Sequence, residues 1–345
     1  MEYLNADQAK QLVETYMKTE GRISSTQELL DSGAIPKLKG YTVRPGKVSD
    51  SIYGGKVSFT VDKDKPTERR VEVENPPLNT NEGTPLRLMV RTERISTHDI
   101  NRGVIPFKDQ ILATNHNYMR RLLQQVLGTS QLDVPGLADN AVVIAAEDLE
   151  QIPFENVLRA YMAKSTTSTS LYQHYLKGSR TFAGHALPGG LRSNGPLPYV
   201  MDTPSTKSET HDETLSPEDM FERGICTPQQ YQQVRNSSLF AFGVVSEFLR
   251  SKGLIAVDTK TEHGINSDGQ IVSQDEIWTM DSSRFWLSSD YREQMEKLCS
   301  GEIKELNPAY AAEVFEGDYS MPPGTQLRVP EGRHETFASR FVQFP

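Results

Sequence analysis

Apolar or β-branched residues alternate with charged ones along residues 254–262. A period of two predicts a β-strand with one polar face. The charged positions of this strand are Asp258, Lys260 and Glu262. The turn sequence NSDG at 266–269, with β-branched residues after it, predicts that the strand continues into a hairpin.

The register of this hairpin decides which charged side chains meet. A two-residue loop at 268–269 places Glu262 opposite Asp275, with Lys260 on the same face. Such a group suits a magnesium ion and a polyphosphate, because carboxylate oxygens hold the metal and the ammonium meets phosphate oxygens. A three-residue loop would bring Glu276 to that face instead. The competing interpretation is an exposed hairpin with solvated charges.

Helical patterns occur in three other segments. Apolar residues recur at helical spacing from 109 to 127, and Gly128 stands where helices commonly end. Thr227, followed by proline, predicts the start of a second long helix, and Gly253 predicts its end. A shorter packing helix is expected after Asn5.

Short strands and loops make up the rest of the chain. Strands are expected within 41–73, at 86–90 and within 140–149, whereas 73–85 is expected to be a loop. Residues 188–217 are rich in Gly, Pro, Ser and Thr, which predicts either a disordered linker or a binding loop. Strands dominate early and helices alternate with strands later, so we expect an α+β chain with two lobes and a cleft.

Composition narrows the class of protein. A chain of 345 residues with 36% hydrophobic and 24% charged residues is typical of a soluble globular protein. The net charge of -9 argues against a nucleic-acid partner. The two cysteines lack metal-ligand spacing, which argues against a disulfide scaffold or a structural zinc site. Without a signal-like N-terminus or a membrane-length apolar segment, the expected location is the cytoplasm, with no membrane partner.

Six separated segments carry motifs in the order found in one known family. They read RPGKVSDSIY (44–53), LMVRTERISTHD with IPFKDQIL (88–112), PFENVLRAYMAKS (153–165), LPGGLRSNGPLPYVMDTPSTK (187–207), GLIAVDTKTEHG (253–264) and DEIWTMDSSRFW (275–286). The first resembles a Gly-Lys-Val-Arg-Asp motif and the second an Asp-Arg-Ile-Ser-Ala-Tyr/Phe-Asp motif. Together they resemble the SAICAR synthetases (phosphoribosylaminoimidazole-succinocarboxamide synthases), ligases of purine biosynthesis.

The resemblance implies a reaction. ATP, L-aspartate and carboxyaminoimidazole ribotide (CAIR) would give the succinocarboxamide SAICAR, ADP and phosphate. A carboxylate is a poor acyl donor, so phosphorylation to an acyl phosphate precedes attack by the amine. Such a site needs positioning and positive charge around the phosphoryl group rather than a nucleophilic side chain. The implied cofactors are ATP and Mg²⁺, and the implied partners are small-molecule substrates, with the protein a monomer or homo-oligomer.

The resemblance also implies how the chain is divided. The expected fold is α+β and two-lobed, with an N-terminal mainly antiparallel β lobe, a C-terminal α/β nucleotide-binding lobe of ATP-grasp-like character, and the active site in the cleft. The expected divisions are an N-terminal helical extension (1–40), a β-rich lobe (41–150), an ATP and substrate lobe (151–299) and a C-terminal extension (300–345).

Matching motif positions imply roles for individual residues. The implied ATP-binding residues are Gly46, Lys47, Glu155, Lys207, Lys260, Glu262 and Asp275. Two of these, Glu262 and Asp275, would also hold magnesium. The implied substrate-binding residues are Ser96, Arg159, Ser165 and Arg284, the last three matching positions that bind the ribotide 5′-phosphate. The implied catalytic residues are Lys260, Asp99 and Arg94.

The resemblance breaks at particular positions. Ser49 stands where the family has arginine, Glu93 where it has aspartate, and His98 where it has an aromatic residue. Lys164 replaces a glycine and His263 a phenylalanine. The ATP and phosphate elements are better preserved than the amine end of the site. Two alternatives therefore stay open: a related ATP-dependent amide ligase with another amine or carboxylate, and a non-catalytic nucleotide-binding regulator.

Overall fold

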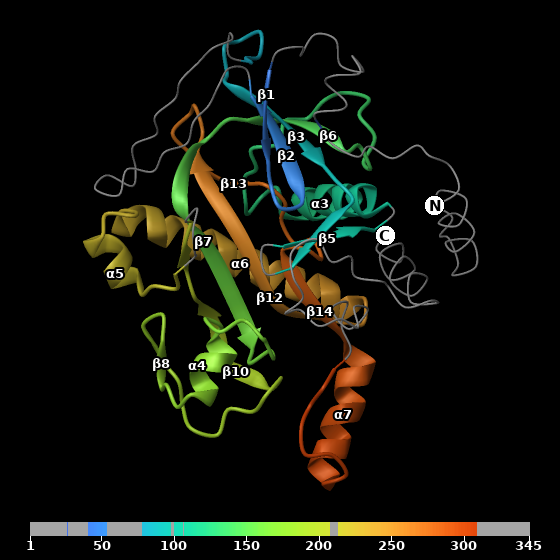
Figure 1. Cartoon of the computed structure of the whole chain (residues 1–345), viewed down its shortest axis with the longest axis vertical. Coiled ribbons are helices and arrows are strands. Elements are labelled where there is room, and N and C mark those ends of the chain that lie inside the picture. The colour runs from blue at the N-terminus through green and yellow to red at the C-terminus, as the bar shows by residue number, and fades with distance from the viewer. Residues whose placement is uncertain are drawn as a thin grey trace, which may run out of the picture.

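The computed structural model describes residues 26, 41–53, 78–97, 100–105, 107–207 and 213–308 (Figure 1). The helix expected after Asn5 and the strands expected between residues 54 and 73 lie outside these ranges. Within them, no helix has the length and apolar character needed to cross a membrane. Helices and antiparallel sheets make up the described structure, which confirms the α+β class.

The smaller of the two main sheets has the strand order β1-β2-β3-β6 and is antiparallel throughout. Its strands are β1 (Thr42–Pro45), β2 (Ser49–Tyr53), β3 (Leu86–Arg91) and β6 (Val143–Glu147). These confirm the strands expected at 86–90 and within 140–149. Next to it, β4 (Arg94–Thr97) pairs with β5 (Ile100–Val104) as a hairpin.

The larger sheet has six strands and is built around two long ones, which run side by side in Figure 1. They are β7 (Glu150–Tyr161) and β12 (Leu254–Ile265), each of 12 residues. The other strands are β10 (Pro196–Asp202), β11 (Ser205–Thr206), β13 (Ile271–Gln274) and β14 (Ser283–Leu287). A separate short hairpin joins β8 (Thr181–Phe182) to β9 (His185–Ala186).

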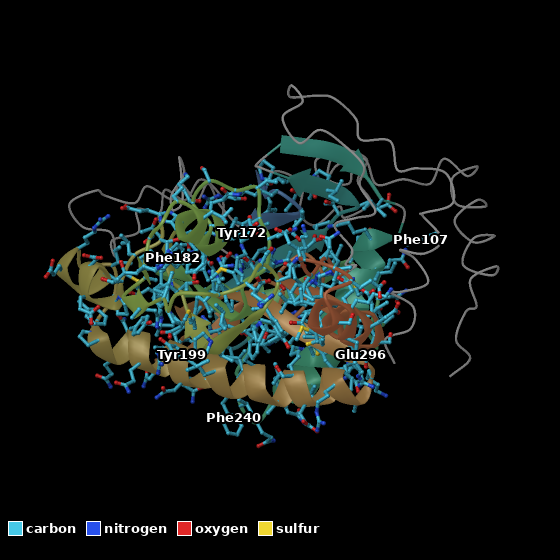
Figure 2. All side chains as sticks on the ribbon, turned by 90° about the horizontal axis from the view of Figure 1, so that it is seen from below. Phe107, Tyr172, Phe182, Tyr199, Phe240 and Glu296 are labelled. Carbon is cyan, nitrogen blue, oxygen red and sulfur yellow. The ribbon has the colours of Figure 1, made fainter. Side chains whose placement is uncertain are left out.

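One long helix covers a face of the larger sheet. The described helices are α3 (Lys108–Leu123), α4 (Leu171–Leu176), α5 (Pro217–Glu222), α6 (Pro228–Ser251) and α7 (Ser288–Ser300). Helix α6 starts with a capping box between Thr227 and Gln230 and is followed by Gly253 at φ 75°, as predicted. Its apolar side joins Leu158 of β7 in the largest core cluster, while Phe240 points away from the sheet (Figure 2).

The predicted role of Gly128 as a helix end is wrong. Helix α3 ends at Leu123, and the following residue, Gln124, keeps a right-handed conformation. Gly128 instead allows the backbone to pass close to Val272, because a Cβ at this position would lie 2.8 Å from Cγ1 of Val272. Its carbonyl accepts hydrogen bonds from the backbone and hydroxyl of Ser273, at 2.8 Å each. This contact ties the end of α3 to the larger sheet.

The segment from 188 to 217 is not only a linker or loop. It contains β10 and β11, which both pair with β7. Sequence composition misses these strands because their hydrogen-bonding partners in β7 lie 35–52 residues earlier in the chain. Tertiary pairing therefore overrides the local preference of a Gly- and Pro-rich segment.

The first register predicted for the hairpin after β12, with a two-residue loop, is wrong, and the observed pairing has the parity of the three-residue alternative. Glu262 lies opposite Gln274 rather than Asp275, and Ile265 lies opposite Ile271. The loop between the strands has five residues, because Oδ1 of Asn266 accepts hydrogen bonds from the backbone of Asp268 at 3.1 Å and of Gln270 at 2.8 Å. The side chain of Asn266 thus organises a wider turn than the two-residue loop that its sequence suggests.

Strand β12 is buried on both faces rather than half-buried. One face carries Asp258, Lys260 and Glu262, and the other carries Thr261 and His263. On that second face, Oγ1 of Thr261 lies 3.5 Å from Oγ of Ser238 in α6. The strand is therefore central, with the carboxylates of Asp258 and Glu262 buried and Lys260 partly exposed.

We predict that His263→Phe stabilises the protein. His263 is 1% exposed and both ring nitrogens lack a hydrogen-bond partner in the described structure. An unpaired buried polar group costs about 1–3 kcal/mol, and phenylalanine removes that cost. Chemical denaturation at pH 7 measures the gain, with His174→Phe on exposed α4 as the control.

The same variant should flatten the pH dependence of stability. Burial lowers the pKa of His263 from 6.5 to about 4. As the pH falls from 6.5 towards 4, the unfolded chain takes up a proton that the folded protein refuses, so stability is lost across this range. The phenylalanine variant lacks this component. An unchanged pH profile and an unchanged free energy of unfolding would contradict both expectations.

Candidate active site

Two glutamates and two lysines meet where β7, β11 and β12 run together. Glu155 of β7 lies opposite Glu262 of β12 and opposite Ser205 of β11. Nζ of Lys260 lies 2.8 Å from Oε1 of Glu155 and 3.5 Å from Oε1 of Glu262. Nζ of Lys207, just after β11, lies 3.1 Å from Oε1 of Glu155 and also contacts Oε1 of Glu262. Four predicted ATP-site residues thus form one cluster.

This cluster has buried carboxylates and more exposed ammonium groups. The glutamate side chains are 8–9% exposed, whereas those of Lys207 and Lys260 are 38% and 41% exposed. Burial on its own would raise the pKa of Glu262, but the two lysines outweigh it and lower the pKa to about 2. Burial would lower the pKa of Lys260, and the glutamates raise it. Glu262, Lys207 and Lys260 therefore stay charged at neutral pH, with the cations facing outward.

Asp275, the other predicted magnesium ligand, lies in a turn rather than in the paired strand and contacts Arg87 of the smaller sheet. It follows β13 in a left-handed conformation, φ 58°, which an aspartate tolerates better than most residues. Its Oδ1 accepts a hydrogen bond from Nη2 of Arg87 at 3.0 Å, and its side chain is 37% exposed. The charge of Asp275 contributes to the raised pKa of Lys260. Sequence reasoning missed Arg87, whose signal is a charge inside an otherwise apolar strand.

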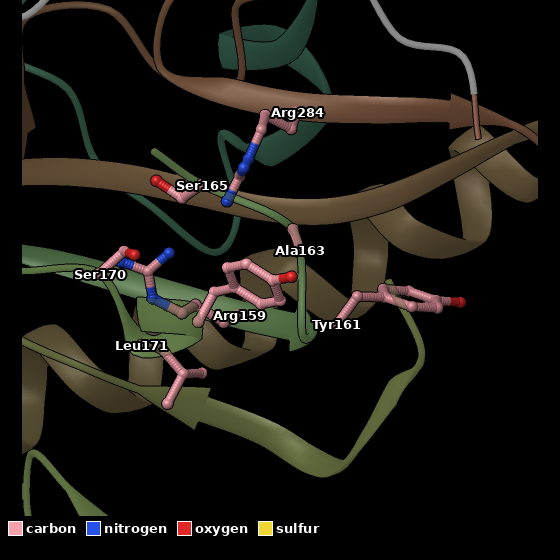
Figure 3. A pocket seen from close by; sticks show the side chains of 8 residues that line it. Arg159, Tyr161, Ala163, Ser165, Ser170, Leu171 and Arg284 are labelled. Carbon is pink, nitrogen blue, oxygen red and sulfur yellow. The ribbon is translucent and has the colours of Figure 1, made fainter. Parts of the chain in front are cut away.

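The three predicted phosphate ligands line one pocket (Figure 3). Arg159 comes from β7, Arg284 from β14 and Ser165 from the segment after β7. Between the two arginines lies Asp258 of β12, which pairs with both of them in the strand register. Its carboxylate accepts from Nε of Arg284 at 2.9 Å and from Nη1 of Arg159 at 3.4 Å.

Asp258 was not predicted as a site residue, although it stands in the alternation of β12. Burial lowers the pKa of Arg159, Asp258 opposes that shift, and Arg284 adds to it. Burial would raise the pKa of Asp258, but Arg284 and then Arg159 lower it. The three groups form a triad with one net positive charge, in which Asp258 is buried and the two arginines are partly exposed. Two guanidinium forks next to the Ser165 hydroxyl suit a phosphate dianion.

The predicted Gly-Lys turn lies between β1 and β2, in the smaller sheet. The backbone N–H of Gly46 donates to Oδ1 of buried Asp50 at 3.2 Å, and its carbonyl accepts from Nη2 of Arg94 at 3.1 Å. A Cβ on Gly46 would lie 2.2 Å from the carbonyl oxygen of Ser49, so only glycine fits. Arg94 also pairs with Asp50, which holds it against this turn.

Three predicted site residues remain: Lys47, Ser96 and Asp99. Lys47 is exposed. Ser96 belongs to β4, but its side chain, like Asp99 as a whole, lies outside the described residues. The expected grouping of Arg94, Ser96 and Asp99 therefore stays a prediction.

The donor set around Lys260 fits a magnesium ion. In the described ranges, no three His, Cys, Asp or Glu side chains are arranged to hold a metal by themselves. Magnesium does not need such a cage, because it is commonly held by one or two carboxylates together with substrate phosphates and water. Glu262 and Asp275 supply two carboxylates near Lys260, so the residues fit the ion.

Fold and site together define a class of protein. Lysines above buried carboxylates suit a phosphate chain with its metal, and the arginine pocket suits a second phosphate. Both lie on the same face of the larger sheet. The class is therefore an α+β enzyme that binds phosphorylated small molecules.

Comparisons with known sequences narrow that class. Residues 79–302 match the family model of SAICAR synthetase. A phosphoribosylaminoimidazole-succinocarboxamide synthase from Legionella pneumophila is 33% identical over 258 residues, covering 74% of this chain and 80% of the relative. A chloroplastic synthase from Arabidopsis thaliana is 37% identical over 210 residues, 61% of this chain, but the chain spans only 50% of that relative.

Solved structures of the same name share the fold. A SAICAR synthase from Saccharomyces cerevisiae in complex with SAICAR aligns with a TM-score of 0.58 and 21% identity, covering 87% of this chain and 92% of that one. A type-2 SAICAR synthetase in complex with ADP aligns with a TM-score of 0.51 and 20% identity, covering 72% and 85%. The chain belongs to the SAICAR synthetase family, ligases of purine biosynthesis.

We predict that Asp258→Asn destabilises the protein by about 2–4 kcal/mol at pH 7, because two partly buried guanidinium groups lose their buried counter-charge. Denaturant unfolding measures the loss. The control is Asp139→Asn, which removes a carboxylate from an exposed pair with Arg121. The control should cost less than about 1 kcal/mol. Equal effects of the two substitutions would show that the triad is not electrostatically stabilised.

Proposed function

We propose that this chain joins L-aspartate to CAIR with the use of ATP, giving SAICAR, ADP and phosphate. The observation that carries this proposal is the charged face of β7 and β12. The arginine triad at Asp258 and the lysine cluster at Glu262 lie four residues apart along β12. Four strand residues span about 13 Å, which a nucleotide-sized ligand can bridge. A ribotide with its phosphate at the triad would thus present its other end to the lysines.

The lysine cluster is the proposed ATP end of the site. Lys207 and Lys260 would meet phosphate oxygens, since their ammonium groups face outward from the buried glutamates. Glu262 and Asp275 would hold magnesium, and Glu155 keeps both lysines in place. Magnesium, when bound, would supply positive charge to the phosphate oxygens during transfer. Gly46 and Lys47 would approach the same phosphates from the smaller sheet, which makes the site a cleft between two lobes of ATP-grasp-like character.

The proposed chemistry needs no nucleophilic side chain. A carboxylate oxygen of CAIR would attack the γ-phosphorus of ATP, and the bond from that phosphorus to the bridging oxygen would break with release of ADP. The amine of aspartate would then attack the acyl carbon and expel phosphate, losing a proton. The protein holds the reactants and balances charge, which is the main contribution of enzymes to phosphoryl transfer. Arg94, Ser96 and Asp99 are proposed to serve the amine end.

A second candidate is a related ligase that uses another amine. The observation that favours it is a rebuilt segment before α3. Phe107 adopts φ 64°, a conformation that favours glycine, and its backbone N–H donates to Oε1 of Glu93 at 2.7 Å. Glu93 itself replaces the family's aspartate. The unusual residues Phe107 and Glu93 thus contact each other directly, and Glu93 is the neighbour of Arg94 in the chain.

Measurement of ADP release separates these candidates. Purified protein with Mg-ATP and CAIR is assayed with aspartate and with a panel of other amino acids. We expect turnover with aspartate, and none with excess chelator. Turnover with another amine only would favour the second candidate. No turnover with any amine would favour a nucleotide-binding regulator and refute the proposed function.

We predict that Arg284→Ala raises the KM for CAIR with little change in the KM for ATP. Loss of a charge-assisted pair with a phosphate dianion costs on the order of 2–4 kcal/mol, or roughly thirty- to a thousandfold in kcat/KM. Arg284→Lys should rescue only partly, because an ammonium cannot form the planar fork. The same changes at Arg159 should behave alike.

The control for these variants is Arg250→Ala. Arg250 pairs with Glu247 on the surface of α6 and is 74% exposed. Its removal should leave all kinetic constants unchanged. Unchanged CAIR kinetics in Arg284→Ala would show that this arginine does not bind the phosphate.

A further inference from the structure

Asn194 is a buried polar residue in the turn before β10, close in space to the phosphate pocket but not part of its lining. It is 1% exposed and adopts φ 55°, a left-handed conformation that asparagine tolerates better than most residues. Its backbone N–H donates to the carbonyl of Met162 at 2.8 Å, and its carbonyl accepts from the hydroxyl of Tyr291 at 3.2 Å. The segment after β7 and helix α7 therefore both hold the backbone of this turn.

The side-chain amide of Asn194 joins two further segments of the chain. Its Oδ1 accepts a hydrogen bond from the backbone N–H of Lys164 at 2.8 Å, and its Nδ2 donates to the carbonyl of Leu306 at 2.9 Å. A backbone N–H can only donate and a carbonyl can only accept, so these two partners fix the orientation of the amide. Aspartate lacks the donor and leucine lacks both groups. The residue type is thus matched to its two partners.

The peptide of Lys164 is the link to the phosphate pocket. Its carbonyl accepts a hydrogen bond from Nη1 of Arg284 at 3.0 Å. The next residue, Ser165, lines the same pocket as Arg284 (Figure 3). Lys164 is therefore held by Asn194 at its N–H and holds a guanidinium at its carbonyl. A shift of this residue would displace two proposed phosphate ligands together.

The C-terminal segment 305–307 supports the same place from the other side. Nζ of Lys164 lies 3.0 Å from Oε2 of Glu305. The backbone N–H of Asn307 donates to Oε1 of Gln294 in α7 at 2.6 Å, and its carbonyl accepts from Nε2 of Gln294 at 3.0 Å. The segment is therefore anchored to α7 while it contacts the residue before the pocket.

We propose that Asn194 is a positioning residue for the phosphate pocket: its amide holds the Lys164 peptide and thereby the guanidinium of Arg284. Ser165 follows in the chain and is placed by the same contact. The bond to Leu306 makes the C-terminal segment part of this support. The inference rests on the proposed function, because the pocket takes the CAIR phosphate only there. Asn194 acts through the Lys164 peptide and does not touch the substrate.

The test is Asn194→Gly, which removes the amide but keeps a residue that adopts φ 55° without strain. Calorimetry measures the Kd of ribose 5-phosphate, a probe of the phosphate end alone, and the ADP-release assay measures the KM for CAIR and for ATP. Misplacement of a binding group by about 1 Å can cost about a hundredfold, so both the Kd of ribose 5-phosphate and the KM for CAIR should rise roughly ten- to a hundredfold. The KM for ATP should change little, because the amide of Asn194 contacts the phosphate-pocket side rather than the lysine cluster.

Asn117→Ala is the matched control. Asn117 is also a buried asparagine, 4% exposed, and its amide accepts from Nε2 of Gln131 and donates to the carbonyl of Asp139, at 2.8 Å each. None of these three residues lines the phosphate pocket. The control should lower the melting temperature and leave the affinity for ribose 5-phosphate unchanged. An equal loss of affinity in both variants would show a general loosening of the protein and overturn the proposal.

Tyr291→Phe keeps the test decisive if Asn194→Gly does not fold. It removes only the hydroxyl that donates to the carbonyl of Asn194 and keeps the ring that stacks on Trp286. Loss of this one hydrogen bond should raise the Kd of ribose 5-phosphate by about two- to fivefold. Wild-type affinity in folded Asn194→Gly, or in Tyr291→Phe where the glycine variant is unfolded, overturns the inference.

Failure of the proposed function gives a different pattern. Wild type that binds ribose 5-phosphate but shows no turnover of CAIR refutes the proposed function, while the affinities of the variants still decide the inference. Wild type that turns over CAIR, with the same KM for CAIR in Asn194→Gly, supports the proposed function and overturns the inference.

Discussion

The pairing of β7 with β12 is the interaction on which the rest of this structure depends. Its register sets Arg159 opposite Asp258 and Glu155 opposite Glu262. Opposite residues share a face, so this one register arranges a row of charges along the sheet. Burying those charges is tolerable only because each has a partner of opposite sign within reach. The geometry of the site and its electrostatic stability therefore have the same origin.

Charge balance also explains how the two sheets are joined. Asp275 leaves the end of β13 in a left-handed conformation and meets Arg87 of the smaller sheet. A carboxylate that is to bind a metal must be held at one oxygen and left accessible at the other. The ion pair with Arg87 involves Oδ1 of Asp275, and the Asp275 side chain is 37% exposed. The contact thus joins the two sheets through a residue that we propose as a magnesium ligand.

Two departures from the family motif lie next to other unusual residues in the structure. Phe107 occupies a conformation suited to glycine, and the longer carboxylate of Glu93 accepts its backbone N–H. Ser49 lacks the guanidinium of the motif, and Arg91 stands directly across from it. In each case the two residues are far apart in sequence or lie on different strands. A sequence motif shows the changed residue, but it does not show the residue that lies beside it in the structure.

The sequence by itself determined the elements with strong local signals. The alternation along β12 and the capping residues of α6 are local, and a period of two already placed Asp258, Lys260 and Glu262 on one face. Only the tertiary structure decided what those charges meet. The register after β12 depended on how the Asn266 side chain shaped its turn, and the counter-charges come from strands distant in sequence. Periodicity sets the direction of a side chain, whereas its partner is set by long-range strand pairing, which no local pattern contains.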